Sequence, residues 1–378
     1  MKMSAEQFLT EFLNIPSVNG RDDERQAAYF IGDFLKEAGL DVRIQEIDDS
    51  HANVISVLEG KTKDVVIWNG HLDTVPYGKP EEWNTDPSKA VRIDDRLYAR
   101  GASDMKSGLA GMAYVLASMK EQNDKPEKTI LFCATCDEER GGLGAARLLE
   151  YLKKDQFGTP SLMLIGEPTN MRPGIAQKGC IWLRLCVHGK TSHGAYPEQG
   201  INAVEYGIKI FEDLKKKIEA QEHALLGHST VQITGISGGI APNMTPDAAE
   251  IRLDIRVVPG ITTDQILTYA REYANDYTNQ KNGFLKVEIK LENDRRALEI
   301  PEDNEWVCKI KKQLEMRKKE IKPIGINFFS DASILVRGFP QTPVLLFGPG
   351  ESELAHQPNE SVLLSNYVDY IELLRQLF

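Results

Sequence analysis

A histidine and an aspartate stand together at the end of an apolar segment near the start of the chain. His71 and Asp73 follow residues 65–67, Val-Val-Ile, which the β-branched run predicts to be a buried strand. Side chains two residues apart point to the same side of an extended chain, so the imidazole and the carboxylate leave the strand together. Such a pair can act as a general base or as a metal ligand held in one tautomer, although a turn with a capping aspartate also fits.

Two further predicted strands also end in acidic residues. The apolar segment 129–136 leads into the acidic run 137–139, and the apolar segment 161–165 is followed by Glu167. Three consecutive acids at the end of a buried strand repel one another unless a cation or water solvates them. A solvated helix N-terminus, which favours negative charge, is the plainer interpretation of the run by itself.

Two more candidates lie next to predicted elements. Asp104 precedes a helix predicted over residues 107–119, where it could be an N-cap, and His356 follows an apolar segment at 343–347. The residues that share such a placement are His71, Asp73, Asp104, Glu138, Glu139, Glu167 and His356.

These residue types suit metal chemistry. Mixed imidazole and carboxylate donors are typical of zinc and similar divalent ions. Two histidines and three carboxylates are too many for one tetrahedral site with an open position, but they suit two ions about 3.5–4 Å apart that share one carboxylate. A remaining glutamate could then take a proton from water.

The composition limits what else the protein can be. A chain of 378 residues with 41% hydrophobic residues is long enough for two domains. A net charge of −11 argues against nucleic acid as a partner. The N-terminus lacks a signal-peptide pattern, no apolar stretch approaches the roughly 18 residues of a membrane span, and the five cysteines suit a reducing cytoplasm. We therefore expect a cytoplasmic protein without membrane partners.

Apolar strands that alternate with helical patterns predict an α/β domain, and a different pattern interrupts it. We expect a catalytic domain over residues 1–177 and 293–378, with an insertion over residues 178–292. The insertion reads as strand, helix, strand, strand, helix, strand, which is the split βαβ pattern of a ferredoxin-like α+β domain.

Five short motifs contain these candidate residues, at residues 70–76, 100–108, 137–139, 166–169 and 355–360. In this order they resemble the motifs of the dinuclear zinc amidohydrolase and exopeptidase family, which includes acetylornithine deacetylase, succinyl-diaminopimelate desuccinylase, aminoacylase and glutamate carboxypeptidase. The resemblance covers essentially the whole chain. It implies a zinc-peptidase-like catalytic domain with a mixed central sheet flanked by helices, and an inserted lid and dimerisation domain.

The resemblance also implies metal-site roles. Two Zn²⁺ ions, which Co²⁺ or Mn²⁺ could replace, would share Asp104, whose peptide bond to Met105 is expected to be cis. Asp73 would hold His71 in its ligating tautomer, and Glu138 would be the general base and then the acid. The implied ligands are His71 and Glu167 for one ion, and Glu139 and His356 for the other.

Further roles fall on the insertion and on a glycine-rich loop. By the resemblance His193 would stabilise an oxyanion, in its own or the partner subunit's site of a homodimer, although the residue types alone favour a surface histidine. Asn243 and Arg256 would contact substrate, with an ion pair as the plainer interpretation of Arg256. Gly350 could offer its backbone N–H to a substrate carboxylate.

The expected function is hydrolysis of the amide bond of a small N-acyl amino acid, of the deacetylase or desuccinylase type, by a metal-bound water that Glu138 activates. A dipeptidase or carboxypeptidase acting on small peptides is the alternative within the family. A non-catalytic binding protein is a remote alternative, which the presence of Glu138 disfavours. A nucleotide site at residues 142–144, Gly-Leu-Gly, is a weak match because Arg147 replaces the third glycine.

Overall fold

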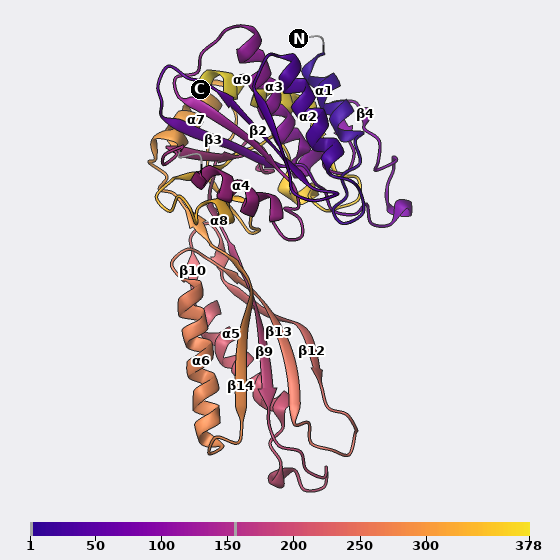
Figure 1. The fold of residues 1–378 in the computed structure, drawn as a ribbon, viewed down its shortest axis with the longest axis vertical. Coiled ribbons are helices and arrows are strands. Elements are labelled where there is room, and N and C mark those ends of the chain that lie inside the picture. The colour runs from indigo at the N-terminus through magenta and orange to yellow at the C-terminus, as the bar shows by residue number, and fades with distance from the viewer. Residues whose placement is uncertain (1–2, 155–156) are drawn as a thin grey trace. The chain divides into compact units, whose positions relative to one another are not determined.

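The computed structural model describes residues 3–154 and 157–378, which form two compact units (Figure 1). The first unit comprises the chain up to residue 175 together with 299–324 and 330–378, and the second comprises 176–298 and 325–329. The segment 325–329, expected in the catalytic domain, therefore clusters with the inserted one. Its Ile326 carbonyl accepts a hydrogen bond from the Lys178 N–H at 2.9 Å, a contact between distant residues that local sequence periodicity does not reveal.

The first unit is built on a mixed sheet, as the sequence analysis expected. Strand β3 lies inside it and runs parallel to β6 and β7, and β17 is parallel to β7. Strand β2 pairs antiparallel with β1 and β6, and β8 pairs antiparallel with β17. Every residue of β3 is buried, as expected of a strand covered on both faces. The sheet order is β1 (Val42–Glu46), β2 (Ala52–Leu58), β6 (Thr129–Thr135), β3 (Val65–His71), β7 (Leu162–Ile165), β17 (Val344–Leu346), β8 (Gly174–Gln177) and β15 (Leu298–Glu299), with β16 (Ile324–Ile326) paired to β8.

Helices flank this sheet (Figure 1). Helix α3 packs against α1, α2 and α9, and helix α4 packs against α8. The first helix begins at a capping box between Ser4 and Gln7 and buries the apolar face Phe8, Leu9, Phe12 and Leu13. The helices of this unit are α1 (Ala5–Leu13), α2 (Arg25–Glu37), α3 (Ser107–Glu121), α4 (Leu143–Lys154), α7 (Glu305–Met316), α8 (Ala332–Leu335) and α9 (Leu364–Leu377).

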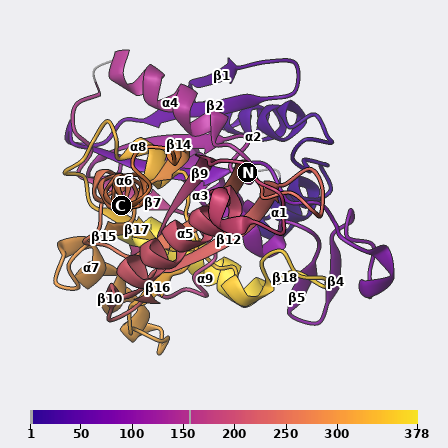
Figure 2. The same cartoon turned by 90° about the horizontal axis from the view of Figure 1, so that it is seen from below.

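A second, small sheet lies at one edge of the same unit (Figure 2). It contains β4 (Val91–Ile93), β5 (Arg96–Tyr98) and β18 (Ser361–Leu363), in the order β18-β5-β4. Because β18 pairs antiparallel with β5, the residues that precede β18 lie beside the residues that follow β5.

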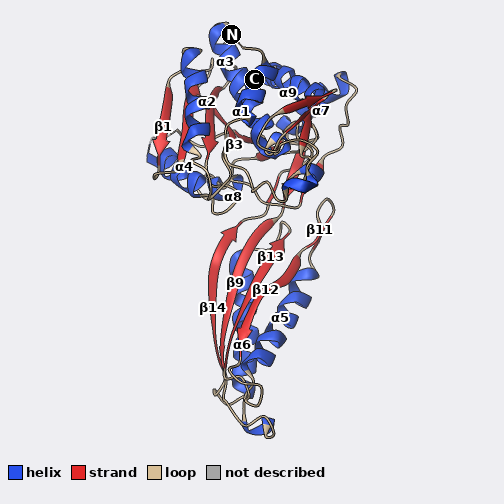
Figure 3. Cartoon of the chain, turned by 90° about the vertical axis from the view of Figure 1, so that its right-hand side faces the viewer, coloured by secondary structure: helices blue, strands red, loops and turns tan. Residues whose placement is uncertain are grey.

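Apart from the short pair β10-β11, the second unit has the strand and helix order that the sequence predicts. Four of its strands pair antiparallel in the order β12-β13-β9-β14 (Figure 3), which is the split βαβ arrangement. Alternate residues of β9 are buried in a common core with both helices. The elements are β9 (Gly179–His188), α5 (Ala203–Glu219), the short β10 (Glu222–His223) and β11 (Gly227–His228), β12 (Thr230–Gly238), β13 (Ala248–Val257), α6 (Thr263–Gln280) and β14 (Lys286–Arg295).

The sequence analysis expected no membrane-spanning segment, and it expected cysteines suited to a reducing environment. No helix among the described residues has both the length and the apolarity to cross a membrane. The cysteines at positions 133, 136, 180, 186 and 308 are free thiols, and the first three are buried.

Candidate metal centre

The parallel strands of the central sheet bring their acidic ends to one edge. His71 is the last residue of β3, the run 137–139 follows β6, and Glu167 follows β7. Since β3 is parallel to both β6 and β7, their carboxyl ends meet at the same edge of the sheet, where ligand sites of open α/β sheets lie.

Two groups of candidate ligands form there and share Asp104. The first group contains His71, Asp104 and Glu167, and the second contains Asp104, Glu139 and His356; within each group one ligand atom per residue lies within 4.8 Å of the others. The Asp104–Met105 peptide bond is cis, as expected.

The Asp104 carboxylate faces both histidines. Its Oδ1 lies 3.2 Å from Nε2 of His71, and its Oδ2 lies 3.2 Å from Nε2 of His356. Nε2 of His356 also lies 3.1 Å from Oε2 of Glu139. Each oxygen of one carboxylate is thus directed at a different group, as a bridging ligand requires.

The backbone of Asp73 contacts the His71 ring. Nδ1 of His71 donates to the Asp73 carbonyl oxygen at 2.9 Å, whereas the nearest carboxylate oxygen of Asp73 lies 3.8 Å from Nδ1. A proton on Nδ1 leaves the lone pair of Nε2 directed at the cluster. The sequence analysis gave Asp73 the role of holding His71, and in the structure the carbonyl of Asp73 makes this contact.

The Asp73 carboxylate instead holds the residues after β6. Its Oδ1 accepts from the Glu138 N–H at 3.1 Å, and its Oδ2 accepts from the Glu139 N–H at 3.0 Å. Nδ2 of Asn19 donates to the same Oδ2 at 3.0 Å and to Oδ1 of Asp137 at 3.1 Å. Asp73 therefore orients the backbone of two acidic site residues.

The electrostatics of the cluster favour a cation. Burial, together with neighbouring carboxylates, raises the pKa of Glu138 and of Glu167 well above the usual range. The carboxylates of Asp104 and Glu139 raise the pKa of His356 to about 10. Among the residues that the structure describes, Oε1 of Glu138 is buried without a hydrogen-bond partner. Crowded buried carboxylates with imidazoles form a donor set that fits zinc and similar divalent ions.

Several polar residues near the cluster received no role in the sequence analysis. Asp331 is 2% exposed and helps to raise the pKa of Glu138. Glu24 is fully buried, accepts from the Asp137 N–H at 3.0 Å, and has its pKa raised to about 9 by burial and by Asp73. Arg100 and Glu360 lie within the motifs at residues 100–108 and 355–360. Membership of these motifs was the only feature of the sequence that pointed to them. Charged residues are usually exposed, so their burial could not be read from the sequence.

The predicted substrate-binding residues of the inserted unit lie at two separate positions, before the start of β13 and near its end. His193 and Asn243 lie in adjacent loops, where the Gly194 N–H donates to the Asn243 carbonyl at 2.7 Å. Asn243 precedes the start of β13, whereas Arg256 is near its end and pairs with Asp254 at 2.7 Å. A strand rises about 3.3 Å per residue, so Asn243 and Arg256 are roughly 25 Å or more apart within one chain.

Gly350 of the first unit is tightly packed. A Cβ at this position would lie 2.2 Å from the Ser103 carbonyl oxygen, so the close approach of two backbone segments requires glycine here. Its role as a substrate contact remains a prediction.

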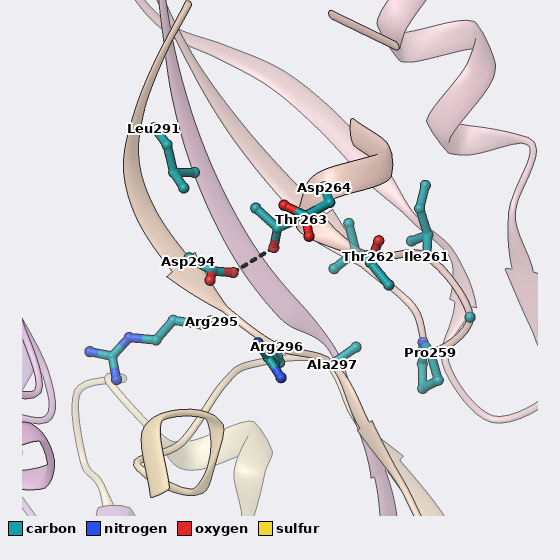
Figure 4. A pocket seen from close by; sticks show the side chains of 12 residues that line it. Pro259, Ile261, Thr262, Thr263, Asp264, Leu291, Asp294, Arg295, Arg296 and Ala297 are labelled. Atoms are coloured by element: carbon teal, nitrogen blue, oxygen red, sulfur yellow. Dashed lines mark hydrogen bonds between the residues drawn. The ribbon is translucent and has the colours of Figure 1, made fainter. Parts of the chain in front are cut away.

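A separate hollow of about 440 Å³ lies in the second unit, at the N-terminus of α6 (Figure 4). Oγ1 of Thr263 donates to Oδ1 of Asp294 at 2.5 Å on its wall. The hollow contains none of the metal candidates, which all belong to the first unit.

The chemistry that this α/β sheet edge supports is hydrolysis at a divalent-metal centre, which is the chemistry of the metallohydrolases. A sequence model described as Peptidase family M20/M25/M40 matches residues 67–378, and the chain belongs to this family of metal-dependent hydrolases. The expected family resemblance is thereby confirmed.

Curated relatives match nearly the whole chain. An acetylornithine deacetylase from Aliivibrio salmonicida (strain LFI1238) is 29% identical, over 98% of this chain and 97% of the relative. A probable succinyl-diaminopimelate desuccinylase from Staphylococcus aureus (strain MRSA252) is 24% identical, over 98% and 95%.

Solved structures share the fold. A tripeptidase from Staphylococcus aureus superposes with a TM-score of 0.77 at 20% identity, over 100% of this chain and 98% of that one. A dinuclear metal-binding peptidase of the M20 family from Bacillus subtilis superposes with a TM-score of 0.72 at 14% identity, over 99% and 96%.

Proposed function

We propose that the protein is a dinuclear metal-dependent deacylase that hydrolyses the amide bond of a small N-acyl amino acid. The observation that carries this proposal is the pair of histidine–carboxylate groups that share Asp104 next to the buried Glu138. The acetylornithine deacetylase and desuccinylase names of the curated relatives favour an acetyl or succinyl group.

Two zinc ions, replaceable by cobalt or manganese, are the proposed cofactors. One ion would be held by His71 and Glu167, the other by Glu139 and His356, and both by Asp104. When bound, the ions supply Lewis acidity that polarises the acyl oxygen and favours ionisation of the attacking water.

Glu138 is the proposed proton carrier. Glu138 is 6% exposed and directly precedes the proposed ligand Glu139, and Asp73 accepts hydrogen bonds from the backbone N–H groups of both residues. In its ionised form Glu138 takes a proton from the attacking water and then delivers it to the leaving amine. Its Oε1, which has no hydrogen-bond partner among the described residues, is available to accept this proton.

The inserted unit is proposed as a lid and dimerisation domain. One amino-acid-sized substrate cannot contact both Asn243 and Arg256 of the same chain, because they are roughly 25 Å or more apart along β13. We assign Arg256 to the substrate carboxylate, in exchange for its Asp254 partner, and His193 and Asn243 to the site of the partner subunit in a homodimer. The free thiols suit a cytoplasmic location.

Hydrolysis of a dipeptide or the C-terminal bond of a small peptide is the second candidate. The structural similarity to a tripeptidase favours it, and the same residues would perform the chemistry because a peptide bond is also an amide.

The test is a substrate screen on metal-free protein reconstituted with zinc, cobalt or manganese. N-acetyl and N-succinyl amino acids and dipeptides are supplied at equal concentration, and the released amine is measured. We expect metal-dependent release from an N-acyl amino acid. Preferential release from dipeptides would support the second candidate, and binding of metal without turnover of any substrate would indicate a binding protein.

A further inference from the structure

A buried carboxylate outside the two ligand groups lies behind Asp104. Glu360 is fully buried, and its Oε1 accepts from the backbone N–H groups of Ser103 and Asp104, each at 2.9 Å. Its Oε2 accepts from Nη1 of Arg100 at 2.7 Å. Three donors, one of them charged, thus satisfy this buried anion.

The Arg100 guanidinium also contacts the segment that leads from His356 to Glu360. Its side chain is 3% exposed, and Nη1 also donates to the Gln357 carbonyl oxygen at 3.1 Å. Gln357 directly follows His356. The guanidinium lies 5.0 Å from the centre of the Trp83 ring, which limits its movement.

Backbone contacts join the same two segments. The Ala99 N–H donates to the Glu360 carbonyl at 3.1 Å, and Oγ of Ser103 donates to the Ser361 carbonyl at 2.9 Å. The segment 99–104, which ends in Asp104, and the segment 356–361, which begins with His356, therefore form one hydrogen-bonded block.

We propose that Glu360 and Arg100 are positioning residues that set the Asp104 carboxylate relative to His356. This inference rests on the proposed function, in which both residues are metal ligands. Glu360 acts through the amides of Ser103 and Asp104, and Arg100 acts through Glu360 and the Gln357 carbonyl, so neither contacts the ions.

The block affects the two ion positions unequally. The Glu139–His356 position takes two of its three protein ligands, Asp104 and His356, from the block. The other position takes only Asp104 from it, since His71 and Glu167 stand at strand ends of the central sheet. Loosening the block should therefore weaken the Glu139–His356 position more.

The test is the zinc affinity of Glu360→Gln. Glutamine keeps the size of the side chain but replaces one acceptor oxygen by an amide donor, which cannot accept from Arg100 or from the backbone. Metal-free protein is titrated with zinc against a chelator of known affinity, so that the two binding steps are resolved. We expect one of the two binding steps to lose about 10- to 100-fold in affinity and the other to change by no more than about threefold.

A matched variant serves as the control, and a second substitution at Glu360 covers the case in which the first variant does not fold. Glu353→Gln makes the same change at an exposed glutamate of the neighbouring loop and should leave both affinities unchanged. Circular dichroism and the thermal midpoint of the metal-free proteins report folding. If Glu360→Gln does not fold, Glu360→Asp keeps the anion for Arg100 but shortens its reach to the amides, and it should show the same unequal loss.

The outcomes separate this inference from the proposed function. Equal loss at both steps, or no loss at either, in a folded Glu360 variant would overturn the positioning role while wild-type protein still binds two ions. If wild-type protein binds no zinc, the proposed function and the inference fail together.

Discussion

Replacing Glu138 by glutamine removes the proposed proton carrier while keeping its shape. Glu138 is 6% exposed, and its backbone N–H donates to Asp73 at 3.1 Å, so glutamine should occupy the same place. Neither ligand group contains Glu138, so the variant should still bind about two ions per chain.

The expected loss follows from the chemistry of the lost group. Glutamine cannot accept the proton of the attacking water or return it to the leaving amine. Removing acid–base catalysis costs about 10²- to 10⁴-fold, which corresponds to about 2.7–5.4 kcal/mol in the barrier. The loss should appear in kcat, with KM changed little, because the carboxylate acts on the reacting atoms.

The assay compares turnover and metal content in the same preparations. Released amine gives kcat and KM on the best substrate of the screen, and elemental analysis gives ions per chain. Glu150→Gln, at an exposed glutamate on α4 paired with Arg147, is the matched control and should retain wild-type values. Turnover of Glu138→Gln within about threefold of wild type, with both ions bound, would refute the assignment because acid–base catalysis contributes far more than this.

Three further changes test other parts of the structure. His356→Ala should lower the metal content by about one ion per chain in elemental analysis, and an unchanged stoichiometry would remove His356 from the ligand set. His193→Ala should reduce kcat by about 10²- to 10³-fold with metal content intact, as for a lost oxyanion donor; loss of metal, or the same loss in the exposed His228→Ala, would contradict its assignment. Glu24 has its pKa raised from 4.5 to about 9, so the folded state holds a proton that the unfolded state releases, and stability falls as pH rises across this interval. Denaturant titrations of metal-free protein should therefore show Glu24→Gln gaining on wild type by up to about 1.4 kcal/mol per pH unit, and parallel curves would disprove the shift.

The sequence was sufficient for the parts of the site that local pattern controls. His71, Glu139 and Glu167 follow apolar runs within a few residues, and such runs become buried strands whatever their partners. Once parallel strands adjoin in one sheet, their carboxyl ends meet at a common edge, so local signals predict a cluster of ligands. Asp104 and His356 were candidates because they lie beside predicted elements, and the motif resemblance gave them their roles as metal ligands.

The tertiary structure decided which atoms make the contacts. The sequence analysis expected Asp73 to hold the His71 tautomer; in the structure the Asp73 carbonyl lies 2.9 Å from Nδ1 of His71, and the carboxylate holds the amides of Glu138 and Glu139. Spacing along a strand fixes the side to which a side chain points, whereas its hydrogen-bond partners depend on turns and rotamers set by distant residues.

Buried charges outside the ligand set were likewise hidden from the sequence. Glu24, Arg100 and Glu360 read as surface residues by type, and only the packed structure buries them. The partners of Glu360 at positions 100, 103 and 104 are more than 250 residues away along the chain. The apolar pattern of the chain thus determined where the ligands gather, and long-range packing determined how they are held, because a charge can be buried only where folding supplies its partners.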